Sequence, residues 1–256
     1  MNYVREKTTQ PPSAVAERRP LQAAWKALQP STLSWQMVDR TRSALMAGEI
    51  ECGDFLGTES SLAGQFGVSR TVVREALRVL GAFGIVEVRA GRNGGVWVAS
   101  GNTALLVNAL AIQLKLIGIS QPEMLDMQAA IEVQSAELAA QRRSEADLAS
   151  LGSIIADLES LVEQPALFTA RSMDFHQAVV DASHNRGLAA QFAALRQLLL
   201  PAYSAHTKAA IAREAIKAHR KLLAKIEAAD SEGARRQMAE RLAQVRARGF
   251  SDTRGL

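Results

Sequence analysis

Between residues 58 and 98 the apolar positions follow first the period of a helix and then the period of a strand. A short first helix has an apolar stripe of Leu62, Ala63 and Phe66, and Gly67 ends it because glycine adopts a positive φ without steric cost. The next helix buries one face, since its apolar residues recur at i, i+3, i+4 and i+7. These residues are Val73, Ala76, Leu77 and Leu80. The pattern therefore predicts two helices joined by a tight turn.

The polar positions of the second helix are as regular as its apolar ones. Ser69 precedes the helix as a predicted N-cap, whose hydroxyl accepts from backbone N–H groups of the first turn. Arg70, Arg74 and Arg78 are four residues apart, so they share the face opposite the apolar stripe. One interpretation is an ordinary amphipathic helix with a solvated basic face, and the other is a helix that binds DNA.

A predicted β-hairpin directly after this helix favours the DNA-binding interpretation. Two β-rich runs, 85–89 and 96–98, flank a turn at 90–95 that contains Gly and Asn. Arg89 ends the first run and Arg92 lies at the tip. A helix beside a basic hairpin is the layout of a winged helix-turn-helix, in which arginines near the helix N-terminus can read guanine edges in the major groove. The tip arginine would then reach a phosphate or the minor groove.

The remaining pattern predicts a mainly α protein in three parts. Residues 1–33 are rich in Pro, Gln and charge, which predicts a flexible tail. Residues 34–101 form the winged helix-turn-helix, with a first helix at 34–47 and a short extended segment at 49–56 that pairs with the hairpin. Residues 102–256 predict an all-α bundle of about seven helices, delimited by capping boxes at 120–123 and 144–147 and by a turn at 185–187. Bundles of this size commonly hold a ligand between facing helices.

Composition adds two constraints. The net charge is only +4, so binding to nucleic acid would depend on a local basic patch. Cys52 is the only cysteine, which excludes an internal disulfide and fits a reducing compartment such as the cytoplasm. No signal peptide is predicted, and the longest apolar run, 103–119, is interrupted by Asn108, Gln113 and Lys115, so no membrane partner is expected.

Several motifs between residues 34 and 99 carry a family resemblance. They include Val68-Ser69-Arg70, Val73-Arg74-Glu75-Ala76-Leu77 and Gly84-Ile85-Val86-Glu87-Val88. Together they resemble the GntR family of bacterial transcription regulators. The resemblance implies that Arg70, Thr71 and Arg74 contact operator DNA and that Gly91 approaches the DNA backbone. The family commonly has a DNA-contacting arginine where this chain has Ser60, so the chain departs from the family pattern at this position.

A second resemblance covers roughly residues 105–247. The motifs Phe175-His176, Ala182-Ser183-His184-Asn185 and His219-Arg220 are similar to the FCD domain of the FadR subfamily, which binds small carboxylate effectors. Many such domains hold a divalent metal through one Asp and three His. The matching positions here are Ser172, His176, His219 and Arg241, and Gln128 matches an arginine that commonly reaches the effector. Because two of the four ligands are replaced, no tightly bound metal is expected.

Arg241 offers another way to bind an acidic effector. Its guanidinium could replace the charge of the metal and bind a carboxylate, or the phosphate or thioester region of an acyl-CoA, while His176 and His219 donate hydrogen bonds. Ser172 and Gln128 complete this expected effector site. The alternative is a decayed pocket in which Arg241 points to solvent.

Three functions fit these patterns. The leading one is a ligand-responsive transcription regulator, usually a repressor in this subfamily, that binds a palindromic double-stranded DNA operator as a homodimer. The second is an enzyme fused to a DNA-binding module, with His176 and His219 as acid/base groups, but nothing in the chain resembles an activated nucleophile. The third is a nonspecific architectural DNA-binding protein that uses the basic tail. A regulator should prefer its operator about 10³-fold or more over random DNA, whereas an architectural protein should not.

Overall fold

The computed structural model describes residues 32–91 and 94–248, and the chain divides into two compact units with a boundary between Ser100 and Gly101. Each unit has a hydrophobic core of its own, so each is described by itself. The predicted tail lies outside the described residues, except for Thr32 and Leu33. Among the described residues, none of the helices has the length and apolar character needed to cross a membrane.

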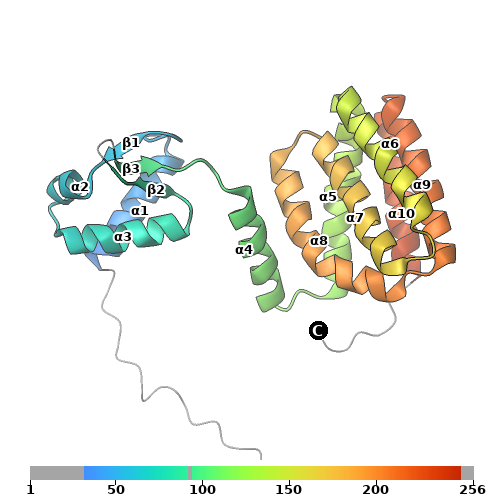
Figure 1. Cartoon of the computed structure of the whole chain (residues 1–256), viewed down its shortest axis with the longest axis horizontal. Helices are drawn as coiled ribbons and strands as arrows, with labels where there is room; N and C mark the ends of the chain where they lie inside the picture. Colours follow the sequence, from blue (N-terminus) through green and yellow to red (C-terminus); the bar gives the residue numbers. More distant parts are fainter. Residues whose placement is uncertain (1–31, 92–93, 249–256) are drawn as a thin grey trace, which may run out of the picture. The chain divides into compact units, whose positions relative to one another are not determined.

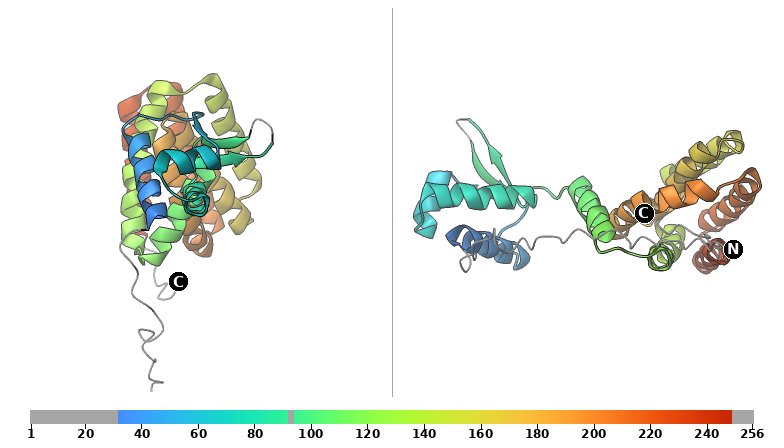
Figure 2. Two further views of the ribbon diagram at one scale, coloured as in Figure 1. Left: turned by 90° about the vertical axis from the view of Figure 1, so that its left-hand side faces the viewer. Right: turned by 90° about the horizontal axis from the view of Figure 1, so that it is seen from below.

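The N-terminal unit combines three helices with a small sheet (Figure 1). Its elements are α1 (Leu33–Met46), β1 (Phe55–Gly57), α2 (Glu59–Phe66), α3 (Arg70–Ala82), β2 (Val86–Arg89) and β3 (Gly95–Val98). The strands are antiparallel in the order β1-β3-β2, and Trp97 of the central strand lies opposite Glu87 on one side and Phe55 on the other. Figure 2 shows β2 and β3 projecting from the helices of this unit. The predicted winged helix-turn-helix is therefore confirmed.

The core of this unit is formed by one face of each helix and by the sheet. Its buried residues are Met37, Val38, Leu62, Val73, Ala76, Leu77, Leu80, Val86 and Val96. All four apolar positions predicted for α3 belong to this set. Gly67 has a φ of 65° at the end of α2, where a positive φ lets the chain turn directly into α3.

Two details of the N-terminal unit differ from the sequence prediction. Phe66 does not join the buried stripe of α2, because the helix ends at this residue and 38% of its surface is exposed. The extended segment is also shorter than expected, since β1 begins only at Phe55. A turn precedes it, with positive φ at Gly53 and a hydrogen bond of 2.7 Å from the Glu51 N–H to the Asp54 carboxylate.

The C-terminal unit is entirely helical in its described residues, and all seven expected helices are found there. They are α4 (Thr103–Leu116), α5 (Gln121–Arg142), α6 (Glu145–Ser160), α7 (Pro165–Ala182), α8 (Arg186–His206), α9 (Ala209–Glu227) and α10 (Ser231–Ala247). Helix α5 contacts α7, α8, α9 and α10, and is therefore central to the bundle (Figure 1). Helix α4 packs against α8, and α6 packs against α7 and α9.

Polar caps fix the helix ends of this unit. Ser120 and Ser144 form the predicted capping boxes at the starts of α5 and α6. The turn predicted at 185–187 is wrong, because Asn185 caps α8 and its Oδ1 accepts from the N–H groups of Gly187 and Leu188. Asparagine is favoured both in turns and as an N-cap, so the local sequence did not distinguish them.

Several polar side chains are buried inside the bundle. They are Gln128, Glu132, Ser135, Thr169, His176, Ser183 and His219. Burying a polar group costs free energy unless it is hydrogen-bonded, so a cluster of such groups in one interior indicates a binding site.

Candidate nucleic-acid interface and effector cavity

Helix α3 presents three arginines on its exposed face. Arg70, Arg74 and Arg78 are exposed, as predicted from their spacing, and Thr71 is exposed as well. Ser69 caps the helix by accepting a hydrogen bond of 3.3 Å from the Val72 N–H. The structure thus brings the expected DNA-contacting residues of α3 together in its N-terminal half, where a recognition helix meets base edges.

Two side chains at the start of α2 orient these arginines. Arg70 Nη2 donates to Ser60 Oγ at 2.8 Å, and Arg74 Nε donates to Glu59 Oε2 at 2.7 Å. A guanidinium has five N–H donors, so one bond leaves most of them available to DNA. Ser60, where the resembling family has an arginine, therefore has a role of its own as an acceptor for Arg70.

The hairpin holds its basic side chain differently. Arg89 forms an ion pair with Glu87 and stacks over Trp97, with its guanidinium carbon 4.6 Å from the ring centroid. Gly91 is exposed and has a φ of 102°, a conformation that favours glycine. Arg92 lies outside the described residues. In the described state Arg89 is thus committed to the wing rather than extended from it.

The helical unit contains a cavity of about 50 Å³. Helices α5, α7, α8, α9 and α10 all contribute to its wall. Its polar lining consists of Gln128, Thr169, Ser172, His176, Tyr203, Thr207 and Arg241. Four of the five residues predicted from the resemblance therefore lie together here. They are far apart in the sequence, since 113 positions separate Gln128 from Arg241.

A chain of hydrogen bonds runs beside the cavity. The Tyr203 hydroxyl donates to Gln128 Oε1 at 2.7 Å, and Gln128 Nε2 donates to Glu132 Oε1 at 2.7 Å. The second oxygen of Glu132 accepts from His176 Nδ1. Burial, with a further contribution from the charge of Glu132, raises the pKa of the Tyr203 hydroxyl, so this group stays protonated as a donor. Because Nδ1 of His176 is engaged, Nε2 is its remaining polar atom.

His219 lies directly behind His176. It stacks on Phe175 with ring centroids 4.2 Å apart, and the ring centroid of His176 is 5.2 Å away in an edge-on arrangement. Neither ring nitrogen of His219 has a hydrogen-bond partner among the described residues, although only 1% of the residue is exposed. Burial lowers the pKa of His219 well below its usual value, and the charges of His176 and Arg241 lower it further, so the ring is neutral.

Arg241 supplies a cation to the cavity from α10. The side chain is largely buried, and its Nε has no hydrogen-bond partner among the described residues. Burial lowers the pKa of its guanidinium, and the neighbouring charge of Arg248 acts in the same direction. Arg241 lines this cavity, which favours the expected effector site over the alternative in which Arg241 points to solvent.

The donor set around this cavity does not fit a divalent metal. No group of three or more His, Cys, Asp or Glu side chains suited to a metal ion occurs within 32–91 and 94–248. At the matching positions, Ser172 offers a neutral hydroxyl and Arg241 places a positive charge where a cation would bind. Two imidazoles alone are fewer ligands than zinc and related metals require.

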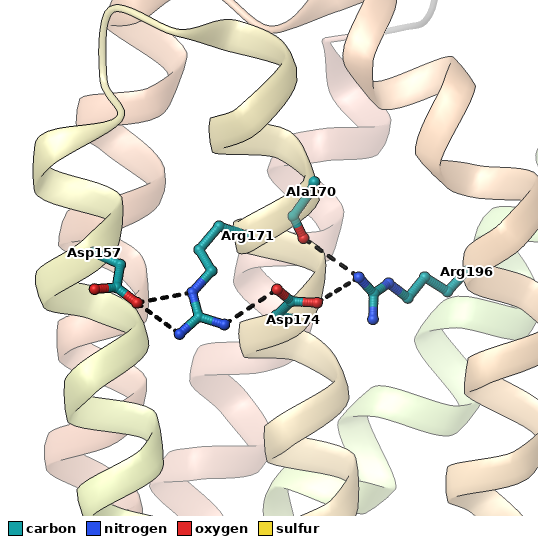
Figure 3. Close-up of polar contacts among 5 residues, drawn as sticks. All are labelled: Asp157, Ala170, Arg171, Asp174 and Arg196. Carbon is teal, nitrogen blue, oxygen red and sulfur yellow. Dashed lines mark hydrogen bonds and ion pairs between the residues drawn. The ribbon is translucent and has the colours of Figure 1, made fainter.

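Asp174 lies two residues before His176 but belongs to a different cluster (Figure 3). Arg171 bridges Asp174 at 3.2 Å and Asp157 of α6 at 2.6 Å, and Arg196 of α8 binds the second Asp174 oxygen. Arg196 also donates to the Ala170 carbonyl at 3.5 Å. The cluster ties α6, α7 and α8 together, which agrees with the expectation that an i, i+2 pair does not form one ligand site.

Three polar lining residues were not anticipated from the sequence: Tyr203, Thr207 and Thr169. Tyr203 and Thr207 are one helical turn apart at the end of α8, and Thr207 Oγ1 lies 2.8 Å from Thr169 Oγ1. The only sequence signal was this four-residue spacing of two polar residues beside Pro201, which is too common to identify a site.

Comparison with known proteins supports both halves of this description. Residues 33–96 match the family model described as bacterial regulatory proteins of the gntR family, and residues 123–244 match the FCD domain. The HTH-type transcriptional regulator LutR of Bacillus subtilis is 33% identical over 138 residues, which are 54% of this chain and 62% of that protein. The Glc operon transcriptional activator of Escherichia coli is 30% identical over 166 residues, 60% of this chain and 62% of that protein.

A solved structure shows the same fold. Streptococcus agalactiae GntR matches with a TM-score of 0.59 at 22% sequence identity, covering 84% of this chain and 100% of that one. The alignments span about three fifths of the length of the curated relatives. With a gntR-family domain followed by an FCD domain, the chain belongs to the gntR family of bacterial regulatory proteins.

Proposed function

We propose that this protein is a sequence-specific DNA-binding transcription regulator. The observation that carries this proposal is the exposed arginine face of α3, where Ser60 and Glu59 hold Arg70 and Arg74 away from the core. Pre-oriented guanidinium groups at a helix N-terminus suit bidentate recognition of guanine in the major groove. The names of the relatives LutR and the Glc operon activator agree with this function.

The helical unit then binds a small acidic effector. Arg241 is a largely buried cation without an ion-pair partner among the described residues, and a carboxylate in the cavity would supply that partner. Ser172 and His176 Nε2 would contribute hydrogen bonds from α7. Gln128 is already engaged by Tyr203 and Glu132, so it positions the wall and the effector contacts fall mainly on the other residues.

The acting species would be a homodimer on a palindromic operator. Two recognition helices, one from each copy, double the number of base contacts and explain how a protein with a small net charge achieves specificity. An acid changes operator affinity only by binding two states of the dimer with different affinity.

The test begins with a binding sequence selected from random duplex DNA. Affinity for that sequence and for random duplex is measured by fluorescence anisotropy, and the expected ratio is about 10³ or more at physiological salt. Arg74→Ala should cost about 1–3 kcal/mol at one base pair of the selected site, if it reads a base edge. Arg213→Ala, an exposed arginine of α9, is the control for loss of one positive charge and should leave the ratio unchanged.

Two results would contradict the proposal. If all duplexes bind with similar affinity, the protein is an architectural DNA-binding protein. If Arg74→Ala weakens every sequence equally, this arginine contacts only phosphate and the base-reading role is wrong.

A further inference from the structure

A second pocket, of about 460 Å³, adjoins the effector cavity at the junction of α8, α9 and α10. The two share Tyr203, Thr207, Ile211, Arg241 and Val245 as lining residues. The remaining lining residues of this outer pocket are Ala205, His206, Lys208 and Arg248. Arg241 therefore stands between a small inner space and a larger outer one.

The outer pocket has a basic lining. Arg241, Lys208 and Arg248 line it, whereas none of its described lining residues is acidic. Arg248 is paired with Glu214, but Lys208 has no ion pair among the described residues. Lys208 is also the N-cap of α9, and no side chain caps this end of the helix, so the helix dipole adds to the positive potential.

The volumes of the two spaces indicate which part of a ligand each of them can hold. The inner cavity of about 50 Å³ has room for roughly three to five waters, enough for one carboxylate with a small substituent. A longer ligand can extend past Arg241 into the outer pocket, because this residue lines both spaces. There it meets the unpaired ammonium group of Lys208.

We propose that the effector is an elongated acid with two anionic groups, one in the inner cavity on Arg241 and the other in the outer pocket on Lys208. The inference rests on the proposed effector site and adds the second anionic group to it. The competing possibility is an acid with a neutral tail, because Ala205, Ile211 and Val245 give the outer pocket an apolar side. The two differ in whether Lys208 contributes to affinity.

The test uses pairs of acids of equal chain length as probes: butanoate and succinate, pentanoate and glutarate, hexanoate and adipate. Their affinities for the full chain are measured by isothermal titration calorimetry. At the best-fitting length, the diacid should bind up to about fivefold more tightly than the monoacid, because an exposed ion pair contributes up to about 1 kcal/mol. Raising the salt concentration should reduce this advantage, since exposed charges are screened.

Substitutions then locate the second anionic group. Lys208→Gln should reduce the advantage of the diacid to less than about twofold and leave the monoacid affinity unchanged. Lys208→Glu should make the diacid bind more weakly than the monoacid. Lys221→Gln, an exposed lysine of α9 that lines neither space, removes the same charge and should change neither affinity.

The outcomes separate this inference from the proposed function. Equal affinity of monoacids and diacids at every length, or binding of the monoacids without measurable binding of any diacid, would show that the site does not take a second anionic group. If neither kind of acid binds, the proposed effector site is wrong. If Lys208→Gln lowers the affinities for the monoacid and the diacid by a similar factor, the role of Lys208 in binding a second anionic group is wrong as well. If the acids bind but Arg241→Gln leaves their affinities unchanged, the proposed effector site itself is wrong.

Discussion

His176 donates through Nδ1 to the carboxylate of Glu132, inside a bundle where no part of Glu132 is exposed. The second carboxylate oxygen accepts from Gln128, which in turn accepts from Tyr203. Three helices, α5, α7 and α8, are thus joined by one chain of hydrogen bonds. Because each member fixes the next, the orientation of the His176 ring at the cavity depends on Glu132, which does not line the cavity, and through it on Gln128 and Tyr203.

Loss of the Glu132 side chain is therefore expected to be costly. Glu132→Ala leaves His176 and Gln128 without their buried partners, and we expect it to lower the free energy of unfolding by about 2–4 kcal/mol. Glu132→Gln should cost less than half as much, because its amide oxygen still accepts from His176. The Gln128 amide can then reverse, so that it accepts from the new amide group and donates to Tyr203. Urea denaturation of both variants provides the comparison, and equal losses would contradict this account.

His219 should make the fold sensitive to mild acid. Its pKa is depressed in the folded protein mainly by burial, whereas in the unfolded chain it is near 6.5, so below that pH only the unfolded state takes up the proton. Stability from this group is fully present above about pH 7 and decreases as the pH falls. Between pH 7.5 and 5.5 the expected loss is about 1.4 kcal/mol.

The matched variant for this prediction is His219→Gln, which does not titrate. Its own stability can be lower at every pH, but its loss between pH 7.5 and 5.5 should be smaller than that of the unmodified protein by about the same 1.4 kcal/mol. Parallel stability curves for the two proteins would show that the pKa of His219 does not differ between the folded and unfolded states, which would contradict the prediction.

Arg241 is expected to reduce the stability of the protein without ligand. A largely buried cation that lacks an ion-pair partner among the described residues is unfavourable, so Arg241→Met should raise the free energy of unfolding by roughly 1 kcal/mol. The same variant should lose the thermal stabilisation that acids give the unmodified protein. Arg236→Met is the control on the same helix, because Arg236 is exposed and paired with Glu232. A destabilised Arg241→Met protein would mean that the guanidinium has a structural role.

Prediction from sequence succeeded where the signal was local and periodic. The spacing of Val73, Ala76 and Leu77 fixed the buried face of α3, and with it the exposed arginines. The turn predicted at 185–187 was misplaced, because asparagine favours both a turn and the N-cap position that Asn185 occupies. The predicted burial of Phe66 was wrong, because an apolar residue at the last position of a helix has few neighbours to cover it.

The cavity was predictable only in part. Ser172, His176 and Arg241 came from matching positions to a family. Tyr203 near the end of α8 and Lys208 at the N-cap of α9 gave no such match, because their place at the pockets depends on how distant helices pack. The sequence also did not predict two contacts between α2 and α3, which are those of Arg70 with Ser60 and of Arg74 with Glu59. These contacts are tertiary, because they form only when the two helices pack against each other.

Ser60 is expected to determine how strongly the protein depends on phosphate contacts. In Ser60→Arg, a second guanidinium replaces the hydroxyl that now accepts from Arg70 at 2.8 Å, so Arg70 loses this partner. The added cation should increase affinity for all duplexes and steepen the dependence of log K on log salt by about one unit. The ratio of operator to random affinity should fall. Anisotropy titrations at several salt concentrations measure both effects, and an unchanged salt slope would place residue 60 away from DNA.

The last prediction concerns the metal that this cavity does not fit. Two substitutions, Ser172→Asp and Arg241→His, would create one carboxylate and three imidazoles at the four matching positions. Glu132 already fixes Nδ1 of His176, which leaves Nε2 for a metal, as second-sphere carboxylates do in metalloproteins. We therefore expect the double variant to retain about one equivalent of zinc or nickel after dialysis, because four ligands of this kind complete a tetrahedral site.

The unmodified protein is the comparison, and metal content is measured by elemental analysis. It should retain no stoichiometric metal, since Arg241 places a positive charge among only two imidazoles. Ser172→Asp alone keeps that charge and should also fail, whereas Arg241→His alone provides three imidazoles and should bind more weakly than the double variant. A stoichiometric metal in the unmodified protein would refute the role assigned to Arg241. A folded double variant without metal would instead show that residues 172 and 241 do not face one common centre.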